Sequence, residues 1–228
     1  MNRRLGVLLY EQAQPMDIIG PWEVFSIWKN VLHAPLEMIL VSENGTPVAC
    51  DNAVILNAHT DFDHCPDLDY LVIPGGKGRL QQGNNARLLA FIKKQSGCAR
   101  HILSVCTGAF LLCQAGVAEN EFMTTYWRAL PELRAAYPIH IKEQRVVKSG
   151  KIFASGGISS GIDLALEVIA DIAGRETAGQ VQLLFEYSPE ATLYATLDTA
   201  STLPPYYNHL APADLPEYIA KYIKSNSG

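Results

Sequence analysis

The sequence lacks the cysteine patterns that mark disulfide-stabilised and zinc-binding proteins. It contains five cysteines, with no Cys-x-x-Cys pair and no regular spacing. An odd number of cysteines in a chain of 228 residues argues against a disulfide framework. The cysteines also form no zinc-ligand pattern with the histidines. We therefore expect free thiols in a reducing compartment and no metal. The five positions are Cys50, Cys65, Cys98, Cys106 and Cys113.

Long apolar runs and clusters of basic residues are missing as well. The apolar run at residues 5–10 is too short for a signal sequence or a membrane span, and Glu11 and Asp17 follow it. Lys and Arg total 18 against 23 for Asp and Glu, which gives a net charge of -5. A mildly acidic chain without a basic run has no electrostatic footprint for DNA or RNA. We expect a cytoplasmic protein that binds neither a membrane nor nucleic acid.

Apolar residues, by contrast, are plentiful and follow an alternating order. Hydrophobic residues make up 48% of the chain, which is enough for one α/β domain buried on both faces of a sheet. Apolar strand-like runs alternate with helical patterns, which predicts a doubly wound, mostly parallel sheet. We expect this domain to cover residues 1–190, with a C-terminal extension at 191–228 packed on it. Predicted strands cover residues 5–10, 36–42, 70–74 and 101–105, with a hairpin at 146–154, and predicted helices cover 21–32, 86–94, 107–115, 161–173 and 176–187.

Cys106 stands between a predicted buried strand and the helix that follows, with almost no loop between them. A residue at such a junction is forced into a sharp, often strained turn above the sheet edge. Gly108 lets the helix pack closely against the strand, and the helix N-terminus favours a thiolate. Cys106 is therefore the candidate nucleophile. The alternative is a small buried apolar residue, which is our interpretation of the other four cysteines.

A second turn supports this site. The predicted strand at 70–74 ends in Gly75 and Gly76, whose backbone amides can face a ligand without obstruction by a Cβ atom. The amides of Gly76 and Thr107 are expected to form an anion-stabilising pocket beside the Cys106 sulfur. An ordinary strand-ending turn is the alternative.

The candidate acid is Asp17, because no histidine has a recognisable partner context. His101 begins the strand that leads to Cys106, so it lies at the opposite end of the sheet. Asp17 follows the first strand and precedes the predicted first helix, which places it at the carboxyl edge of the sheet. Apolar neighbours would desolvate its carboxyl group and raise its pKa, keeping a proton available. A helix-capping role for Asp17 is the alternative interpretation, and Glu23 is the alternative acid.

These residues resemble the ThiJ/PfpI superfamily and, within it, the isonitrile (isocyanide) hydratase branch. Thr107 after the cysteine, rather than His, separates this branch from the peptidase-like one, and Asp rather than Glu at position 17 is also similar to the hydratases. The resemblance extends from residue 5 to about residue 189. It rests on residues 9–10, 16–25, 73–76, 104–109, 124–127, 156–163 and 182–187.

The resemblance implies a flavodoxin-like homodimer that hydrates an isonitrile to an N-substituted formamide without a metal or organic cofactor. It implies that Cys106 attacks the isonitrile carbon and that Asp17 supplies a proton and then assists water addition. Covalent catalysis would divide one difficult addition into two easier steps. Thr107 and Gly76 are expected to position the intermediate. The turn at residues 156–158 is expected to line the site through Ile158; tight helix packing is its alternative role.

The sequence differs from the family pattern at one position of the expected site, and two other functions remain as alternatives. The family usually has His where this chain has Tyr126, which affects the polarity of the pocket and the choice of substrate. A ligand sensor is one alternative, since AraC-type regulators carry a similar domain; the 38 residues after Glu190 are expected to leave no room for their helix-turn-helix region. A redox or carbonyl-stress protein is the other, with oxidation of Cys106 or attack of its sulfur on glyoxals.

Overall fold

Residues 2–187 are described by the computed structural model, and their centre is a six-stranded sheet. The strand order is β2-β1-β5-β6-β10-β9, and every neighbouring pair is parallel except β10 with β9. The central strands β5 and β6 consist mostly of buried apolar residues, because helices cover both faces of the sheet. The strands are β1 (Arg3–Leu8), β2 (Leu36–Val41), β5 (Tyr70–Ile73), β6 (His101–Ser104), β9 (Val146–Ser149) and β10 (Ile152–Ser155).

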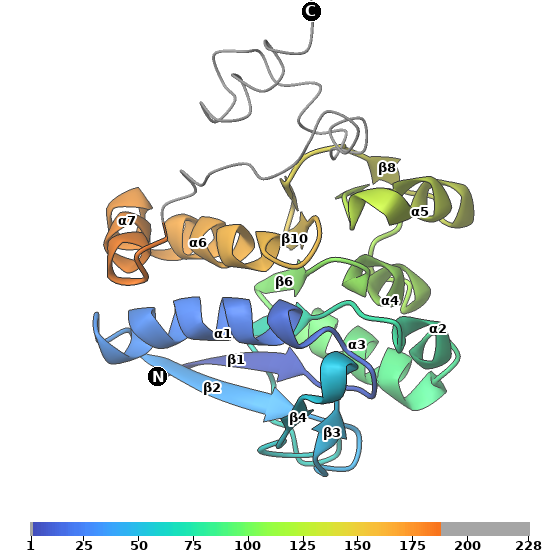
Figure 1. Ribbon diagram of the computed structural model, residues 1–228, viewed down its shortest axis with the longest axis horizontal. Coiled ribbons are helices and arrows are strands. Elements are labelled where there is room, and N and C mark those ends of the chain that lie inside the picture. Colours follow the sequence, from blue (N-terminus) through green and yellow to red (C-terminus); the bar gives the residue numbers. More distant parts are fainter. Residues whose placement is uncertain (1, 188–228) are drawn as a thin grey trace, which may run out of the picture.

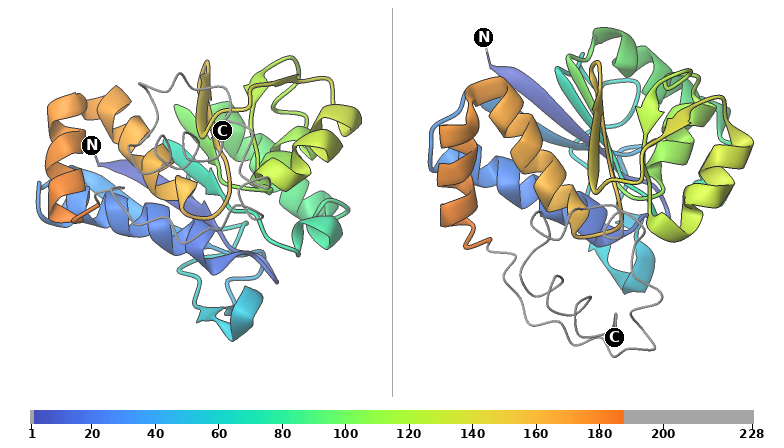
Figure 2. Two further views of the ribbon diagram at one scale, coloured as in Figure 1. Left: turned by 45° about the horizontal axis from the view of Figure 1, so that its top comes forward. Right: turned by 90° about the horizontal axis from the view of Figure 1, so that it is seen from above.

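Helices cover both faces of this sheet, which confirms the predicted flavodoxin-like, doubly wound α/β architecture. One layer contains α1, α6 and α7, and the other contains α2 to α5; the sheet lies between them (Figure 1; Figure 2, right). The first layer consists of α1 (Pro15–Asn30), α6 (Ser160–Ala173) and α7 (Arg175–Leu184). The second consists of α2 (Arg79–Gln82), α3 (Ala86–Cys98), α4 (Gly108–Gln114) and α5 (Leu130–Ala136).

The first helix begins six residues earlier than predicted. It starts at Pro15 rather than at residue 21, because Pro15 takes the first-turn position and Gln14 caps the helix with its side chain. Pro21 therefore lies inside α1, where we had placed the helix start. As a result Asp17 belongs to the first turn of α1 and not to a loop before it. The helix N-cap is Gln14, so Asp17 does not have the capping role that was its alternative.

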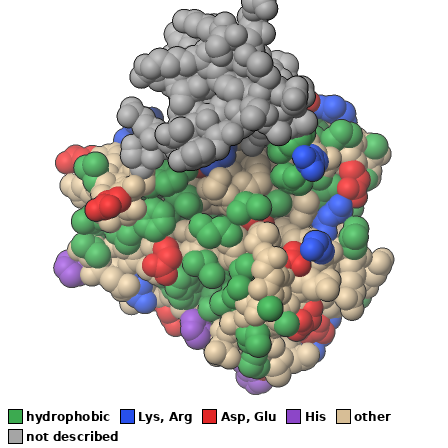
Figure 3. All heavy atoms as spheres, in the orientation of Figure 1, with side chains coloured by type: hydrophobic (Ala, Val, Ile, Leu, Met, Phe, Trp, Pro, Cys, Tyr) green, Lys and Arg blue, Asp and Glu red, His purple; other side chains and the backbone are tan. Residues whose placement is uncertain are grey.

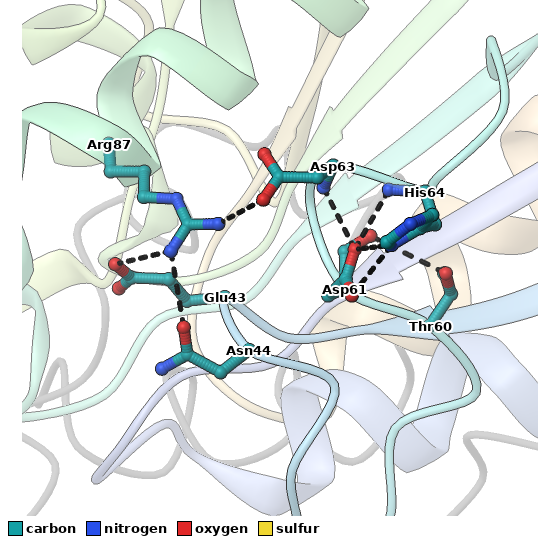
Figure 4. A network of polar contacts seen from close by, with 7 residues as sticks. All are labelled: Glu43, Asn44, Thr60, Asp61, Asp63, His64 and Arg87. Carbon is teal, nitrogen blue, oxygen red and sulfur yellow. Dashed lines mark hydrogen bonds and ion pairs between the residues drawn. The ribbon is translucent and has the colours of Figure 1, made fainter.

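The chain between β2 and β5 makes an excursion beside the sheet. It contains two short hairpin strands, β3 (Val48–Ala49) and β4 (Ile55–Leu56), joined by the 3-10 turn η1 (Asp51–Ala53). Polar contacts fasten this region to α3 (Figure 4). Arg87 of α3 contacts Asp63 at 2.6 Å, Asn44 at 3.1 Å and Glu43 at 3.7 Å. These contacts fasten the loop after β2 to α3, and a backbone hydrogen bond from the Asp51 N–H to the Ala13 carbonyl at 2.9 Å holds η1 beside the loop that follows β1.

The remaining segment, between α4 and β9, forms a small outer layer. It contains the parallel pair β7 (Phe122–Met123) and β8 (His140–Ile141), the 3-10 turn η2 (Trp127–Ala129) and α5. No helix within residues 2–187 has the length and apolar character needed to cross a bilayer. The predicted C-terminal extension at 191–228 lies outside the described residues.

Candidate active site

Cys106 occupies the strained turn that the sequence predicts. Its backbone φ is +54°, a conformation that non-glycine residues seldom adopt, and its side chain is buried. The turn is held from two sides: the Cys106 N–H donates to the Gly156 carbonyl at 2.8 Å, and its carbonyl accepts from the Thr125 hydroxyl at 2.6 Å. A Cβ on Gly108 would lie 2.2 Å from the Ile73 carbonyl oxygen, so the close packing of α4 on β5 requires glycine there.

Asp17 is completely buried beside this turn, at the start of α1. Its Oδ2 accepts a hydrogen bond from the Gly75 N–H at 2.9 Å. Burial raises the pKa of Asp17 to about 7, and the hydrogen bonds from Gly75 and from the Cys106 thiol only partly oppose this rise. Within the described residues, Oδ1 has no partner at good hydrogen-bond geometry. The expected rise in the pKa of Asp17 is therefore confirmed, and the carboxyl group faces the cysteine.

The pKa of Cys106 moves in the direction opposite to our expectation. Burial, and to a smaller extent the negative charge of Asp17, raises the pKa of Cys106 to about 12. The amides of Thr107 and Ile158 and the Thr107 hydroxyl stabilise the thiolate but do not compensate for burial. The helix behind Cys106, α4, has only seven residues, which limits its N-terminal field. At neutral pH the pair therefore consists of a thiol and a carboxyl group that is about half ionised.

The amide of Gly76 does not face the sulfur as predicted. Gly76 has a φ of +134°, and its N–H donates to the Thr107 hydroxyl oxygen at 3.0 Å. The two amides that stabilise the Cys106 sulfur belong to Thr107 and Ile158. Gly75 likewise directs its amide to Asp17 and not to a ligand. The anion pocket that we expected between Gly76 and Thr107 is thus replaced by one between Thr107 and Ile158.

A pocket of about 370 Å³ opens above the Cys106 sulfur. It contains four of the predicted site residues, Cys106, Thr107, Gly76 and Ile158, and it contains Tyr126; Gly75 and Asp17 lie behind its wall. Tyr126 packs against Gly157, where a Cβ would lie 2.7 Å from the tyrosine ring. The full lining is Gln14, Asp51, Gly76, Lys77, Arg79, Leu80, Cys106, Thr107, Tyr126 and Ile158.

No histidine of the described residues lines this pocket. His101 lies at the opposite end of β6, where it stacks on Tyr70 and approaches Asp171 at 3.4 Å. Its predicted position away from the cysteine is confirmed. Among residues 2–187, no three His, Cys, Asp or Glu side chains gather in a way that would hold a metal ion.

Sequence reasoning missed the charged part of the pocket. Lys77 and Arg79 follow the Gly75-Gly76 turn directly, and Asp51 comes from the η1 turn. The two basic residues could have been found from their position just after a strand that ends at the carboxyl edge of the sheet. The position of Asp51 depends on the excursion after β2, which carries no sequence signal of this kind.

The site consists of a cysteine on a strained strand-to-helix turn of a flavodoxin-like sheet. This arrangement defines a class of α/β proteins. Comparison with protein families matches residues 3–171 to the DJ-1/PfpI family. The chain belongs to this family, as the resemblance to ThiJ/PfpI proteins implied.

The chain is similar to the isonitrile hydratase of Pseudomonas putida, with 36% identity over 189 residues that cover 83% of this chain and 80% of the relative. A solved structure of a ThiJ/PfpI family protein from Pseudomonas syringae matches with a TM-score of 0.80 and 25% identity, covering 99% of this chain and 86% of that one. The transcriptional regulator GbdR of Pseudomonas aeruginosa is 25% identical over 154 residues, which are 64% of this chain and 40% of the regulator.

Proposed function

We propose that this protein hydrates isonitriles to N-substituted formamides through a covalent adduct on Cys106. The observation that carries the proposal is the buried pair of a thiol and a carboxyl group, Cys106 with Asp17, at the base of a pocket. The sequence identity of 36% to an isonitrile hydratase supports this proposal. A thiol beside one carboxyl group suits addition to a small unsaturated carbon, because that carbon needs both a nucleophile and a proton.

In the first step Asp17 acts as a base and then as an acid. The Cys106 sulfur forms a bond to the isonitrile carbon while the Asp17 carboxylate removes the thiol proton. The same proton is then delivered to that carbon, which gives a thioimidate, R–N=CH–S–Cys106. The raised pKa of Asp17, about 7, allows both transfers near neutral pH. The high pKa of the thiol means that the proton leaves together with the attack rather than before it.

In the second step water adds to the thioimidate carbon. Asp17, again ionised, removes a proton from the water as its oxygen attacks and passes that proton to the imine nitrogen. The tetrahedral adduct, R–NH–CH(OH)–S–Cys106, then expels the sulfur as the C–S bond breaks. Asp17 takes up the hydroxyl proton and returns it to the Cys106 sulfur, and the formamide R–NH–CHO leaves. The Thr107 and Ile158 amides stabilise the negative charge that returns to the sulfur in this step.

The raised pKa of Cys106 favours this reaction over a redox role. Oxidation sensors react as thiolates, whereas the pKa of Cys106 is raised to about 12 and its sulfur is therefore a thiol at neutral pH. The similarity to GbdR is compatible with a ligand-sensing role, but it covers only 40% of that regulator.

The test is formamide formation from an alkyl isonitrile by the purified protein. We expect turnover by the wild type and none by Cys106→Ala. Cys113→Ala is the matched control, because Cys113 lies on the adjoining helix α4 and its pKa is also raised by burial to about 12, but it does not line the pocket. Turnover that survives in Cys106→Ala, or that is lost equally in Cys113→Ala, would contradict the proposal.

We further propose that residues 1–190 form one domain and that the protein acts as a cytoplasmic homodimer, as the family resemblance implies. Hydrophobic side chains gather on the face that carries α1 and α6 (Figure 3). Met16 and Ile19 of α1 are among the exposed large apolar residues of this protein. Light scattering tests the dimer: a single species of monomer mass at micromolar concentration would contradict it.

A further inference from the structure

Arg79 lines the pocket above Cys106 and carries an incompletely paired guanidinium group. Arg79, the first residue of α2, lines the pocket, and its side chain is only 14% exposed. Its Nη2 donates to Glu132 at 2.7 Å, and its guanidinium lies 3.8 Å from the centre of the Phe110 ring. Among residues 2–187, nothing accepts a hydrogen bond from Nε or Nη1. A largely buried guanidinium with free donors calls for an acceptor.

The contacts that hold Arg79 come from outside the pocket. Phe110 belongs to α4 and Glu132 to α5, and neither residue lines the pocket. The stacking on Phe110 fixes the plane of the guanidinium, since cations bind over aromatic faces. The side chain of Arg79 is therefore already fixed before a ligand binds. A ligand that accepts from its free donors would cause little further loss of side-chain entropy.

Lys77 is a second cation that lines the pocket. Its side chain is 82% exposed, and Nζ lies 3.8 Å from Asp51 Oδ1, which is a loose ion pair. The other lining side chains include Leu80 and Ile158, both exposed apolar residues, and Tyr126. The lining of the pocket thus combines apolar side chains with two cations.

We propose that the substrates are isonitriles that carry a carboxylate on an apolar stem, with Arg79 as the specificity-determining residue and Lys77 as an auxiliary cation. This inference rests on the proposed hydratase function and names its substrate class. The guanidinium fork matches the geometry of a carboxylate, and the ordered donors align the isonitrile carbon over the Cys106 sulfur. A neutral isonitrile would leave these donors in contact with water only.

The test compares ω-isocyanoalkanoates of increasing chain length with their methyl esters, which differ only in charge and the end group. At the best length we expect kcat/KM for the acid to exceed that for the ester by about tenfold or more, the size of a charge-assisted hydrogen bond. Arg79→Met, which keeps an unbranched apolar stem but removes the guanidinium, should abolish this preference while the ester is still converted. Lys77→Met should reduce it about twofold to threefold, as expected for an exposed charge. Esters converted as fast as acids at every length would overturn the proposal.

Two further measurements keep the test decisive. Glu132→Gln removes the negative charge that Arg79 contacts outside the pocket, and this variant should keep the preference for the acid. If Glu132→Gln loses the preference, the preference depends on the Arg79–Glu132 ion pair, which would contradict a direct contact between Arg79 and the substrate carboxylate.

Calorimetry with simple alkanoates and the corresponding alkanamides measures recognition without turnover. If no isonitrile yields a formamide, the proposed function fails, and a carboxylate that binds no tighter than its amide overturns the present inference separately. Arg79→Lys replaces Arg79→Met if the latter fails to fold, and should lower the preference by weakening the bidentate contact.

Discussion

Two aspartates of this protein carry the same side chain in opposite environments. Asp61 lies at the surface in the loop between β4 and β5, where it accepts from the His64 ring at 2.8 Å and from the backbone N–H groups of Asp63 and His64 (Figure 4). These bonds, with the His64 ring contributing most, lower the pKa of Asp61. Asp17 is fully buried with one backbone donor and a thiol, and its pKa rises to about 7.

The difference shows what makes a carboxyl group useful for proton transfer. Asp61 stays ionised over the whole physiological range because every contact stabilises its charge. Asp17 changes its ionisation near neutral pH because burial opposes its charge and too few donors compensate. The hydrogen-bond count and the solvent exposure of each group therefore separate a structural aspartate from a candidate acid and base. The predictions below alter one aspartate and use the other as its control.

The largest effect is expected for Asp17→Asn. The amide keeps the shape of the side chain and can still accept from the Gly75 N–H, but it cannot move a proton between Cys106 and the substrate. We expect kcat/KM for isonitrile hydration to fall by about 10²–10⁴-fold, the usual contribution of a general acid or base. Steady-state formamide assays measure this loss. Equal losses in Asp17→Asn and Asp61→Asn would show that the two sites do not differ as described.

The pH dependence of the wild type is the next effect. The reaction needs the carboxylate form of Asp17, so kcat/KM is expected to rise about tenfold per pH unit below pH 7 and to level off above it, because the pKa of Asp17 is about 7. Rate measurements between pH 5 and pH 9, with circular dichroism to confirm folding, provide the profile. A profile that is already flat at pH 5 would mean that the reacting base has an ordinary carboxyl pKa. The Asp61→Asn variant should reproduce the wild-type profile.

Stability is expected to change in the opposite sense to activity. The folded pKa of Asp17, about 7, exceeds the value of 3.8 for a free carboxyl group. The folded state therefore binds more protons between these values, so the wild type loses stability as the pH rises from about 4 to 7. Asp17→Asn lacks this loss, and we expect it to be more stable than the wild type by about 2–4 kcal/mol above pH 7 and not below pH 4. Urea unfolding at pH 4 and pH 8 measures both differences; a gain of equal size at the two pH values would rule out ionisation as its cause.

The smallest effect is expected for Asp61→Asn. The loop loses an ion pair with His64, which lies at the surface and is screened by salt. Thermal unfolding should show a slightly lower Tm near pH 6, where His64, whose pKa is raised by Asp61, is still protonated. The difference should shrink as the pH rises and His64 loses its charge. Hydratase activity should not change.

The sequence was most informative where one residue decides the local backbone. Cys106 could be placed on a strained turn because only Val105 separates β6 from the turn that leads into α4, and Gly108 indicated close packing. The alternation of apolar runs gave the doubly wound sheet. The start of α1 was misplaced because both Pro15 and Pro21 carry the signal for a first helical turn, and only the cap from Gln14 distinguishes them.

Electrostatic properties and ligand contacts could not be predicted in the same way. The pKa of Cys106 depends on how many residues from distant segments cover it, and burial outweighs the short helix α4. The direction of the Gly76 amide depends on a φ of +134°, which the sequence permits but does not require. The free donors of Arg79 result from its contacts with Phe110 and Glu132, which lie on other helices.

The most direct test of the comparison is a carbon-13 NMR titration of the aspartate side-chain carboxyl groups in the wild type, with Asp17→Asn and Asp61→Asn used to assign the two signals. The account predicts that the Asp17 carboxyl titrates near pH 7, while that of Asp61 titrates below the ordinary aspartate value. An Asp17 signal that titrates at or below pH 4 would contradict it, because an aspartate of ordinary pKa would be too weak a base to remove the proton of the Cys106 thiol, whose pKa is about 12.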